Sequence, residues 1–375
     1  MGYKLGWLKS ATEKLPARAE PACFGIGIPL QRARLACAAL CILAVLVAPS
    51  ARALDGVDTL KIPPTARDVS MGGIRAMSAG AESLFYNPAG IGNLLRPALS
   101  LTHTQLYEGV RLDALGFACP LAEGWGRLGV SLMAMSMTSM EGRDGQGLAS
   151  GSFDAMDTVM GLSWAGEFRH GMEGRGRFGL TVKRVGQRIA DATAVGYSLD
   201  VGAQSNLSAA PRVQLGAGVQ NLGPKMKFSE ESFSQPLTVS LGAGYLAGDT
   251  LLIQCGLSHR PNDNRTTVGV GAEICLGNSV ALRSGYMRLA RAAGAAGAPA
   301  QTQNPLGGLG LGAGWRPMKG GLRIDYAFTP GSTDLGAVHR ITLGMEFGRG
   351  RQNLSKPKAV PADEQWYNFW RVQSP

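Results

Sequence analysis

The sequence predicts an all-β protein, a transmembrane outer-membrane β-barrel of about 14 antiparallel strands with an N-terminal hatch in its lumen. Three observations lead to this prediction. Glycine is twice as frequent as in an average domain, an export signal precedes the rest of the chain, and apolar residues recur at every second position from residue 98 onward.

The composition excludes several other classes of protein. Of 375 residues, 53 are glycine and 17% are charged, whereas soluble domains average about 7% glycine and about 25% charged residues. A hydrophobic content of 45% is too high for a disordered chain. A mean hydropathy of +0.02 is too low for a bundle of membrane helices. An all-β fold remains.

The formal net charge of +10 is concentrated near the N-terminus. Residues 1–53 hold seven of the 37 Lys and Arg residues and two of the 27 Asp and Glu residues, which leaves 30 basic and 25 acidic residues, or +5, for the other 322. No basic block with interleaved aromatic residues remains in that part, so we expect no nucleic acid among the partners.

Residues 1–53 have the organisation of a signal peptide. A basic flank is followed by the apolar run 35–47 and then by Ala51-Arg52-Ala53, and this order is typical of a secretory signal. We expect cleavage after Ala53. No later stretch of 18 apolar residues could form a membrane helix, so an exported chain of this kind is either soluble or a barrel in the outer membrane of a diderm bacterium.

From residue 98 the chain alternates with the period of a β-strand. In 338–347, Ile341, Leu343 and Met345 occupy one face and Thr342 and Gly344 the other. Runs of this kind predict fourteen strands, at 98–106, 111–119, 127–138, 153–166, 177–188, 194–206, 213–221, 236–246, 250–258, 266–275, 280–289, 307–316, 320–328 and 338–347.

The connections between these strands alternate in length. The odd-numbered connections average 10 residues and the even-numbered ones 5.5. Outer-membrane barrels have an even number of strands, short periplasmic turns and longer outer loops. A closed barrel also leaves no unpaired backbone edge in lipid. We therefore expect 98–347 to form the barrel, with the apolar faces toward lipid and with long outer loops at 139–152, 222–235 and 290–306.

On that assignment the lumen wall carries polar groups, methionines and rows of glycine. The glycines either accommodate something packed inside the barrel or ease strand curvature. The methionine row lines a path for apolar ligands or, as we favour, packs against the hatch. The charges have both signs, which favours pairing over ion selection. The predicted lumen residues are Gly242, Gly244, Gly269, Gly271, Gly308, Gly310, Gly312, Gly314, Met133, Met135, Met137, Lys183, Asp200, Arg283, Arg323, Asp325, Arg340 and Glu346.

Residues 54–97 do not alternate and are rich in small residues. They include Asn87-Pro88-Ala89-Gly90, where Asn-Pro indicates a turn. A compact element of this size, placed ahead of the first strand, could fill the lumen. We therefore predict that 54–97 form a hatch.

Several motifs resemble those of a known family. The segment ending in Asn87-Pro88-Ala89-Gly90 is similar to the N-terminal hatch of FadL-type outer-membrane proteins. The stretches 219–228, 320–330 and 334–343 resemble the PorV/PorQ branch of that superfamily, and the resemblance covers roughly residues 65–347. It implies a fourteen-stranded barrel with a lumenal hatch. Family members end in an aromatic residue, whereas 28 residues follow Phe347 here.

The resemblance implies two functions. PorV-like barrels bind exported proteins of the type IX secretion system, which would make cargo proteins and secretion components partners. FadL relatives are passive channels for hydrophobic small molecules, in which the hatch around Asn87 shifts and a kink in the wall releases the ligand into lipid. We expect the first function and keep the second as the alternative.

No catalytic or metal-binding pattern is present in the sequence. The four histidines have no ligand spacing, and Gly310-Leu-Gly312-Ala-Gly314 lies in a predicted strand with no helix after it. We therefore expect a protein that is not an enzyme and binds no cofactor or metal. The last segment, 348–375, is predicted to be a periplasmic tail, because an even number of strands returns the chain to that side.

Overall fold

The computed structural model describes residues 56–143, 145–170, 174–207, 210–228, 230–277, 279–290, 308–317, 321–331 and 336–348. The predicted signal peptide and its cleavage site lie outside these residues, as does the predicted tail beyond Gly348. Within them, no helix is long and apolar enough to cross a membrane.

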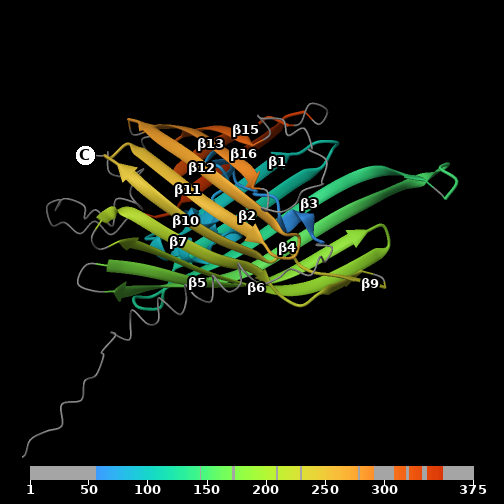
Figure 1. Cartoon of the computed structure of the whole chain (residues 1–375), viewed down its shortest axis with the longest axis horizontal. Helices are drawn as coiled ribbons and strands as arrows, with labels where there is room; N and C mark the ends of the chain where they lie inside the picture. The colour runs from blue at the N-terminus through green and yellow to red at the C-terminus, as the bar shows by residue number, and fades with distance from the viewer. Residues whose placement is uncertain are drawn as a thin grey trace, which may run out of the picture. The chain divides into compact units, whose positions relative to one another are not determined.

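Fourteen antiparallel strands form a closed barrel, in which β1 pairs with both β2 and β16 (Figure 1). The prediction of an all-β, fourteen-stranded barrel is confirmed. The barrel strands are β1 (Ala98–Gln105), β2 (Arg111–Pro120), β3 (Arg127–Arg143), β4 (Ala149–His170), β5 (Gly174–Ile189), β6 (Ala192–Leu207), β7 (Ala210–Leu222), β10 (Thr238–Ala247), β11 (Leu251–Arg260), β12 (Arg265–Leu276), β13 (Val280–Ala290), β14 (Leu309–Trp315), β15 (Leu322–Thr329) and β16 (Val338–Glu346).

Two of the predicted outer loops contain strand structure. β3 and β4 continue to Arg143 and from Ala149, so most of the predicted loop 139–152 is a two-stranded ribbon that projects past the other strands (Figure 1). In 222–235, β8 (Met226–Phe228) and β9 (Glu231–Phe233) form a separate hairpin. Neither segment alternates clearly, so the period-two pattern could not reveal them; cross-strand hydrogen bonding decides both. We call this end of the barrel the outer end and the opposite end the periplasmic end.

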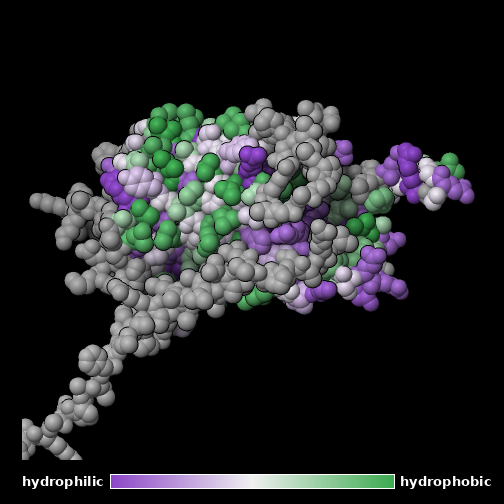
Figure 2. Space-filling model, in the orientation of Figure 1, coloured by the Kyte–Doolittle hydropathy of each residue, from purple (hydrophilic) through white to green (hydrophobic). Residues whose placement is uncertain are grey.

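The wall is apolar outside and polar inside. Leu101, Leu132 and Leu343 are exposed, while Thr102 and Thr342 on the same strands are buried. Figure 2 shows hydrophobic side chains on the outside of the barrel wall and hydrophilic ones on the projecting β3–β4 ribbon. Such alternation is the pattern of outer-membrane barrels. Exposed aromatic residues toward the two ends match interfacial girdles: Trp125, Phe168, Phe178, Trp315 and Phe347 at the periplasmic end, and Tyr107, Tyr197 and Tyr326 at the outer end.

Candidate functional site: the hatch inside the barrel

Residues 56–97 fill the lumen as a chain of short helices. These are η1 (Asp58–Leu60), α2 (Ala66–Ser70), η2 (Arg75–Met77), η3 (Gly80–Phe85) and η4 (Pro88–Asn93). None exceeds six residues, because Gly72, Gly73 and Gly80 adopt positive φ and Pro63, Pro64 and Pro88 interrupt helical hydrogen bonding. The segment therefore turns often and lines the wall from β1 to β16 instead of crossing the lumen as one rod.

The predicted motif Asn87-Pro88-Ala89-Gly90 lies where the hatch meets β5, β6 and β7. Asn87 is fully buried, and its Oδ1 accepts a hydrogen bond from the Ala89 amide at 3.1 Å, which caps η4. Its Nδ2 donates to the carbonyls of Ala76 in the hatch at 2.9 Å and Ala217 of β7 at 3.2 Å. One side chain thus joins two hatch turns to the wall.

A belt of glycines on the lumen side of the wall receives the hatch. They are cross-strand neighbours from β5 to β14, so their missing side chains form one continuous groove. Hatch atoms occupy the positions that Cβ atoms would take at most of them. We call this set the glycine belt: Gly179, Gly202, Gly216, Gly218, Gly242, Gly256, Gly269, Gly271, Gly285 and Gly310.

Five of the glycines predicted to face the lumen contact the hatch. Gly242, Gly269, Gly271, Gly310 and Gly312 face Met77, Gly72, Met71, Val69 and Ser70. Close packing, one of the two explanations considered, is therefore confirmed at these positions. Gly308 instead faces the backbone of Met287, and Gly314 faces the side chains of Asp325 and Arg283.

Filling the belt should displace the hatch. A Cβ at residue 202 collides with the Asn87 side chain, so we expect Gly202→Ala to destabilise the barrel by about 1–3 kcal/mol, the usual cost of overpacking. We also expect ion leakage through single barrels in planar bilayers. Gly145→Ala, where nothing lies within 4 Å, is the matched control. Equal leakage by the two variants would contradict a tight seal at Asn87.

A chain of six charged groups ties the hatch to β12, β13 and β15. Arg67 of the hatch lies 2.9 Å from Glu273, which also pairs with Arg283. Arg283 reaches Asp325 at 2.7 Å, Arg323 Nε lies 2.6 Å from Asp325 Oδ2 as an ion pair, and Arg323 also pairs with Glu82, again in the hatch. The chain has three charges of each sign, and its two ends both belong to the hatch.

Burial alters the acid–base properties of the hatch. It raises the pKa of Glu82 to about 7, against the opposing influence of Arg323. It also raises the pKa values of Asp68 and Tyr86. Because the folded-state pKa of Glu82 is the higher one, the stability that this group contributes is complete below about pH 4.5 and is lost as the pH rises through 7.

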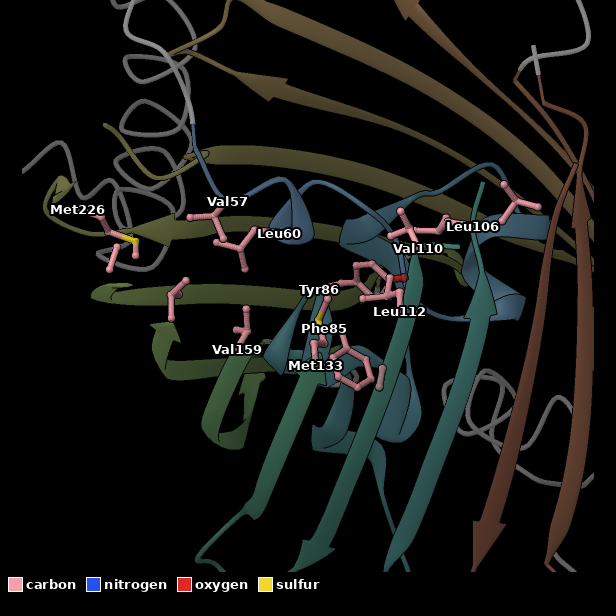
Figure 3. Close-up of a cluster of buried hydrophobic side chains, with 14 residues drawn as sticks. Val57, Leu60, Phe85, Tyr86, Leu106, Val110, Leu112, Met133, Val159 and Met226 are labelled. Atoms are coloured by element: carbon pink, nitrogen blue, oxygen red, sulfur yellow. The ribbon is translucent and has the colours of Figure 1, made fainter. Parts of the chain in front are cut away.

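A cluster of apolar side chains lies in the lumen toward its outer end (Figure 3). This cluster combines side chains from the hatch, the β1–β2 connection, the β8–β9 hairpin and the strand walls. At the edge of the cluster, the guanidinium carbon of Arg75 lies 5.8 Å from the centroid of the Tyr86 ring. Met133 is buried in it, and Met135 and Met137 pack against it. We call it the mouth cluster: Val57, Leu60, Phe85, Tyr86, Leu106, Val110, Leu112, Ala114, Met133, Val159, Val185, Ala194, Met226 and Val338.

One carboxylate anchors the first hatch turn beside this cluster. Asp157 of β4 accepts a hydrogen bond from the Thr59 hydroxyl at 2.7 Å and another from Gln187 at 3.0 Å. The amide of Gly56 donates to the Ser234 carbonyl at 3.1 Å. These bonds hold the start of the hatch at the outer mouth.

The wall is interrupted where β6 meets β7. Leu199 pairs with Leu222 and Val201 with Val219, so two residues of β7, Gln220 and Asn221, lie opposite Asp200. This is the geometry of a β-bulge, and Asn221 has a φ of +60°. The predicted lumen charges Lys183 and Asp200 meet here at 2.5 Å. Asp200 also accepts from the Asn221 amide at 2.8 Å, and Lys183 donates to Asn221 Oδ1 at 3.0 Å.

Beyond the bulge, β7 turns away and the outer part of β6 has no ladder with it. Residues 223–228 and 230–237, which we call the strap, cover the gap from the lumen side. Met226 lies against Gly196, and Gln235 Nε2 donates to the carbonyls of Tyr197 at 2.8 Å and Pro224 at 3.1 Å. The buried Gln235 Oε1 and Ser198 hydroxyl have no partner among the described residues. We call this place the β6–β7 seam.

At the periplasmic end a cavity of about 120 Å³ lies under the hatch. Arg67, Glu82 and Arg323 of the charged chain line it, together with Gln214 and Gln254 of the wall. The hatch is therefore approached by apolar side chains from one end and by charged groups from the other.

The other predicted lumen residues are placed as follows. Arg340 is buried and donates to Thr329 at 3.4 Å, while its Nε has no partner in the described part of the chain. Glu346 is half-buried at the rim of the periplasmic cavity. Cys119, Cys255 and Cys275 are free thiols. In the described ranges no three His, Cys, Asp or Glu residues are arranged to hold a metal.

Sequence reasoning did not single out several residues that the structure places at the hatch and the seam. For the residues on strands, the sequence indication was the alternation along the strand, which places their polar side chains on the lumen side. The residues of the hatch had no such indication, because their partners lie up to 241 positions away in the sequence. These residues are Arg67, Glu82, Asp157, Gln204, Gln220, Asn221, Gln235 and Glu273.

Comparison with known proteins shows the fold. No family model matches the chain, and no curated protein matches it. Among solved structures, the toluene transporter TodX of Pseudomonas putida has a TM-score of 0.52 at 13% identity, over 79% of this chain and 98% of that one. The toluene transporter TbuX of Ralstonia pickettii has a TM-score of 0.50 at 12% identity, over 78% and 100%.

This chain therefore shares its barrel fold with these two transporters. At such identities the likeness extends to the fold alone. The PorV/PorQ affiliation implied by the sequence motifs remains a prediction.

Proposed function

We propose that this protein passively transports apolar small molecules, of the size of a monoaromatic hydrocarbon, across the outer membrane. The observation that carries the proposal is the mouth cluster, an apolar region of the lumen at its outer end. A small apolar molecule gains about 25 cal/mol for each Å² that it buries there. The fold shared with two toluene transporters supports the same function, and it favours this function over the secretion role that we expected first.

The route that fits these residues leads sideways. Straight below the mouth cluster lie the glycine belt and the charged chain, where an apolar molecule would separate buried ion pairs at a high cost in free energy. The β6–β7 seam is closer, and its ladder is already interrupted. We infer that the hatch and strap shift and that the ligand leaves into lipid between β6 and β7.

Uptake of labelled toluene, beside a labelled long-chain fatty acid, tests the proposal. Cells that lack other hydrocarbon channels and express this barrel should take up toluene faster than cells with an empty vector. We expect Met133→Gln/Met135→Gln to lower that rate several-fold, since each amide adds an unpaired polar group to the cluster. Met156→Gln/Met160→Gln, on the lipid-facing side, is the control. Uptake no faster than with the empty vector would refute transport.

A covalent staple across the seam should stop release but not binding. A Cβ at residue 196 would lie 2.5 Å from the Met226 Cγ, near the reach of a disulfide. With the three free cysteines replaced by serine, oxidised Gly196→Cys/Met226→Cys should bind toluene as the unstapled barrel does but take up almost none, and a reductant should restore uptake. Normal uptake in the oxidised form would rule out the β6–β7 route.

A second candidate is the handling of exported proteins. The observation that favours it is the β3–β4 ribbon, which extends beyond its last pairs with β2 at Ser136 and with β5 at Ala155, so both of its edges are open to an added strand. If cargo binds there, deleting residues 138–152 should abolish co-purification of exported proteins while toluene uptake persists. Unchanged co-purification would exclude the ribbon.

We place the mature barrel in the outer membrane of a diderm bacterium, after cleavage near Ala53, and assign it no enzymatic activity. N-terminal sequencing of the protein purified from outer membranes tests the cleavage site; a first residue far from Leu54 would contradict it.

A further inference from the structure

Two arginines stand on the lipid-facing side of β5 near the outer end. Arg184 and Arg188 are exposed and alternate with Lys183 and Val185, which are buried in the lumen. Because successive side chains of a strand point to opposite faces, both arginines project away from the barrel interior.

Their height along the strand corresponds to the upper edge of the apolar band. On the periplasmic side of Arg184, β5 exposes Val182 and Leu180 to lipid. Directly beside Arg184 lies Tyr197 of β6, one of the exposed aromatic residues of the outer end. Charged groups are costly at the centre of a bilayer but tolerated at headgroup level, where tyrosines also gather.

The two arginines lie on the same face of β5, on either side of the recess that a glycine leaves. Gly186 lies between them, and Arg184 Nη1 is 3.8 Å from the position that a Cβ of residue 186 would take. Arg184 therefore extends over the glycine toward Arg188 and the outer end, as arginines do when they reach for the interface. On β4 the outward neighbours beside this recess are Met156, Thr158 and Met160.

Among the described residues, no carboxylate pairs with either arginine. On β6 the outward neighbours are Thr193, Val195 and Tyr197, so neither flanking strand has a carboxylate at these heights. Asp154 and Asp191 lie farther out, near the β5–β6 turn. Among the described residues, neither arginine has an ion pair or a hydrogen bond to a side chain. Two like charges on one exposed face of a strand favour an external anion.

We propose that Arg184 and Arg188 bind the phosphate group of an outer-leaflet lipid headgroup. Guanidinium forks match phosphate oxygens with two parallel hydrogen bonds. Tyr197, directly opposite Arg184 on β6, carries a hydroxyl that can add a donor, and Val182 and Leu180 offer an apolar surface to the acyl chains below. This site is independent of the transport route through the lumen.

Native mass spectrometry of the purified full-length barrel tests the proposal. The barrel is titrated in detergent with diphosphorylated lipid A, with the same lipid after removal of its phosphates, and with inorganic phosphate. We expect Arg184→Gln/Arg188→Gln to weaken binding of the phosphorylated lipid roughly tenfold or more, since each charge-assisted hydrogen bond contributes substantially. Arg184→Lys/Arg188→Lys should retain part of the affinity.

The control removes the same two charges elsewhere. Arg111→Gln/Arg265→Gln changes two exposed cations outside the β5 face and should bind like the parent. A heat-shifted gel mobility shows that each variant is folded. Equal binding of the dephosphorylated lipid, or equal binding by the Arg184→Gln/Arg188→Gln variant, would overturn the proposal. Competition by inorganic phosphate at equal concentration would indicate a free-phosphate site and would overturn the assignment to a lipid.

Discussion

Locking the first hatch turn to the wall should abolish uptake. Thr59 and Asp157 are joined by a 2.7 Å hydrogen bond at the mouth cluster, so cysteines at both positions lie within reach of a disulfide after a small shift. With Cys119, Cys255 and Cys275 replaced by serine, we expect the oxidised double variant to take up toluene at about the rate of the empty vector. Reduction breaks the covalent bond and leaves only weaker contacts at this anchor. The reduced double variant should therefore take up toluene at least as fast as the single variants.

A second cysteine pair separates this effect from general rigidity. His103 Nδ1 and Asp113 Oδ1 lie 2.6 Å apart on the neighbouring strands β1 and β2, but on the lipid-facing side of the wall. Oxidised His103→Cys/Asp113→Cys should transport normally. Normal transport by the oxidised Thr59→Cys/Asp157→Cys barrel would mean that the hatch does not have to move at the mouth.

Breaking the charged chain at its centre should loosen the hatch. Arg283 is fully buried between Glu273 and Asp325, so Arg283→Met leaves three carboxylates and two arginines in the charged chain. Removing one partner of a buried ion pair costs about 3–5 kcal/mol. We expect a lower midpoint of guanidinium unfolding in lipid vesicles and faster cleavage of the hatch by an added protease.

Charge balance provides the control for this second result. Adding Asp325→Asn to Arg283→Met returns the chain to two charges of each sign and should recover part of the lost stability. Arg265→Met changes an exposed arginine whose nearest carboxylate is 3.9 Å away, and it should leave the midpoint unchanged. If Arg283→Met unfolds at the parent's midpoint, the chain does not hold the hatch.

The barrel itself follows from local sequence. Leu343 and Thr342 point to opposite sides because the period of a strand is two, and which side meets lipid follows from hydrophobicity. The fourteen strands and their order could therefore be predicted, with most ends within a few residues. The outer ends of β3 and β4 could not be predicted, because there the two strands pair with each other and show no apolar face in the sequence.

The packing at the glycine belt could be predicted from the sequence only in part. Rows of glycine on the lumen face indicated that something packs there, and Gly271 and Gly310 do receive the hatch backbone. Which hatch atom meets which glycine depends on turns at positive φ, such as Gly72, whose directions the pattern of residue types does not specify.

The sequence by itself thus determined the barrel, its lipid-facing and lumenal sides and the presence of a plug ahead of the first strand. Only the tertiary structure decided that Arg283 joins Glu273 to Asp325, that Asn221 forms a bulge beside Asp200, and that the strap covers the β6–β7 seam. Alternation is a property of neighbouring residues in one strand. Pairing in the lumen depends on three-dimensional closure, which brings together residues far apart in the chain.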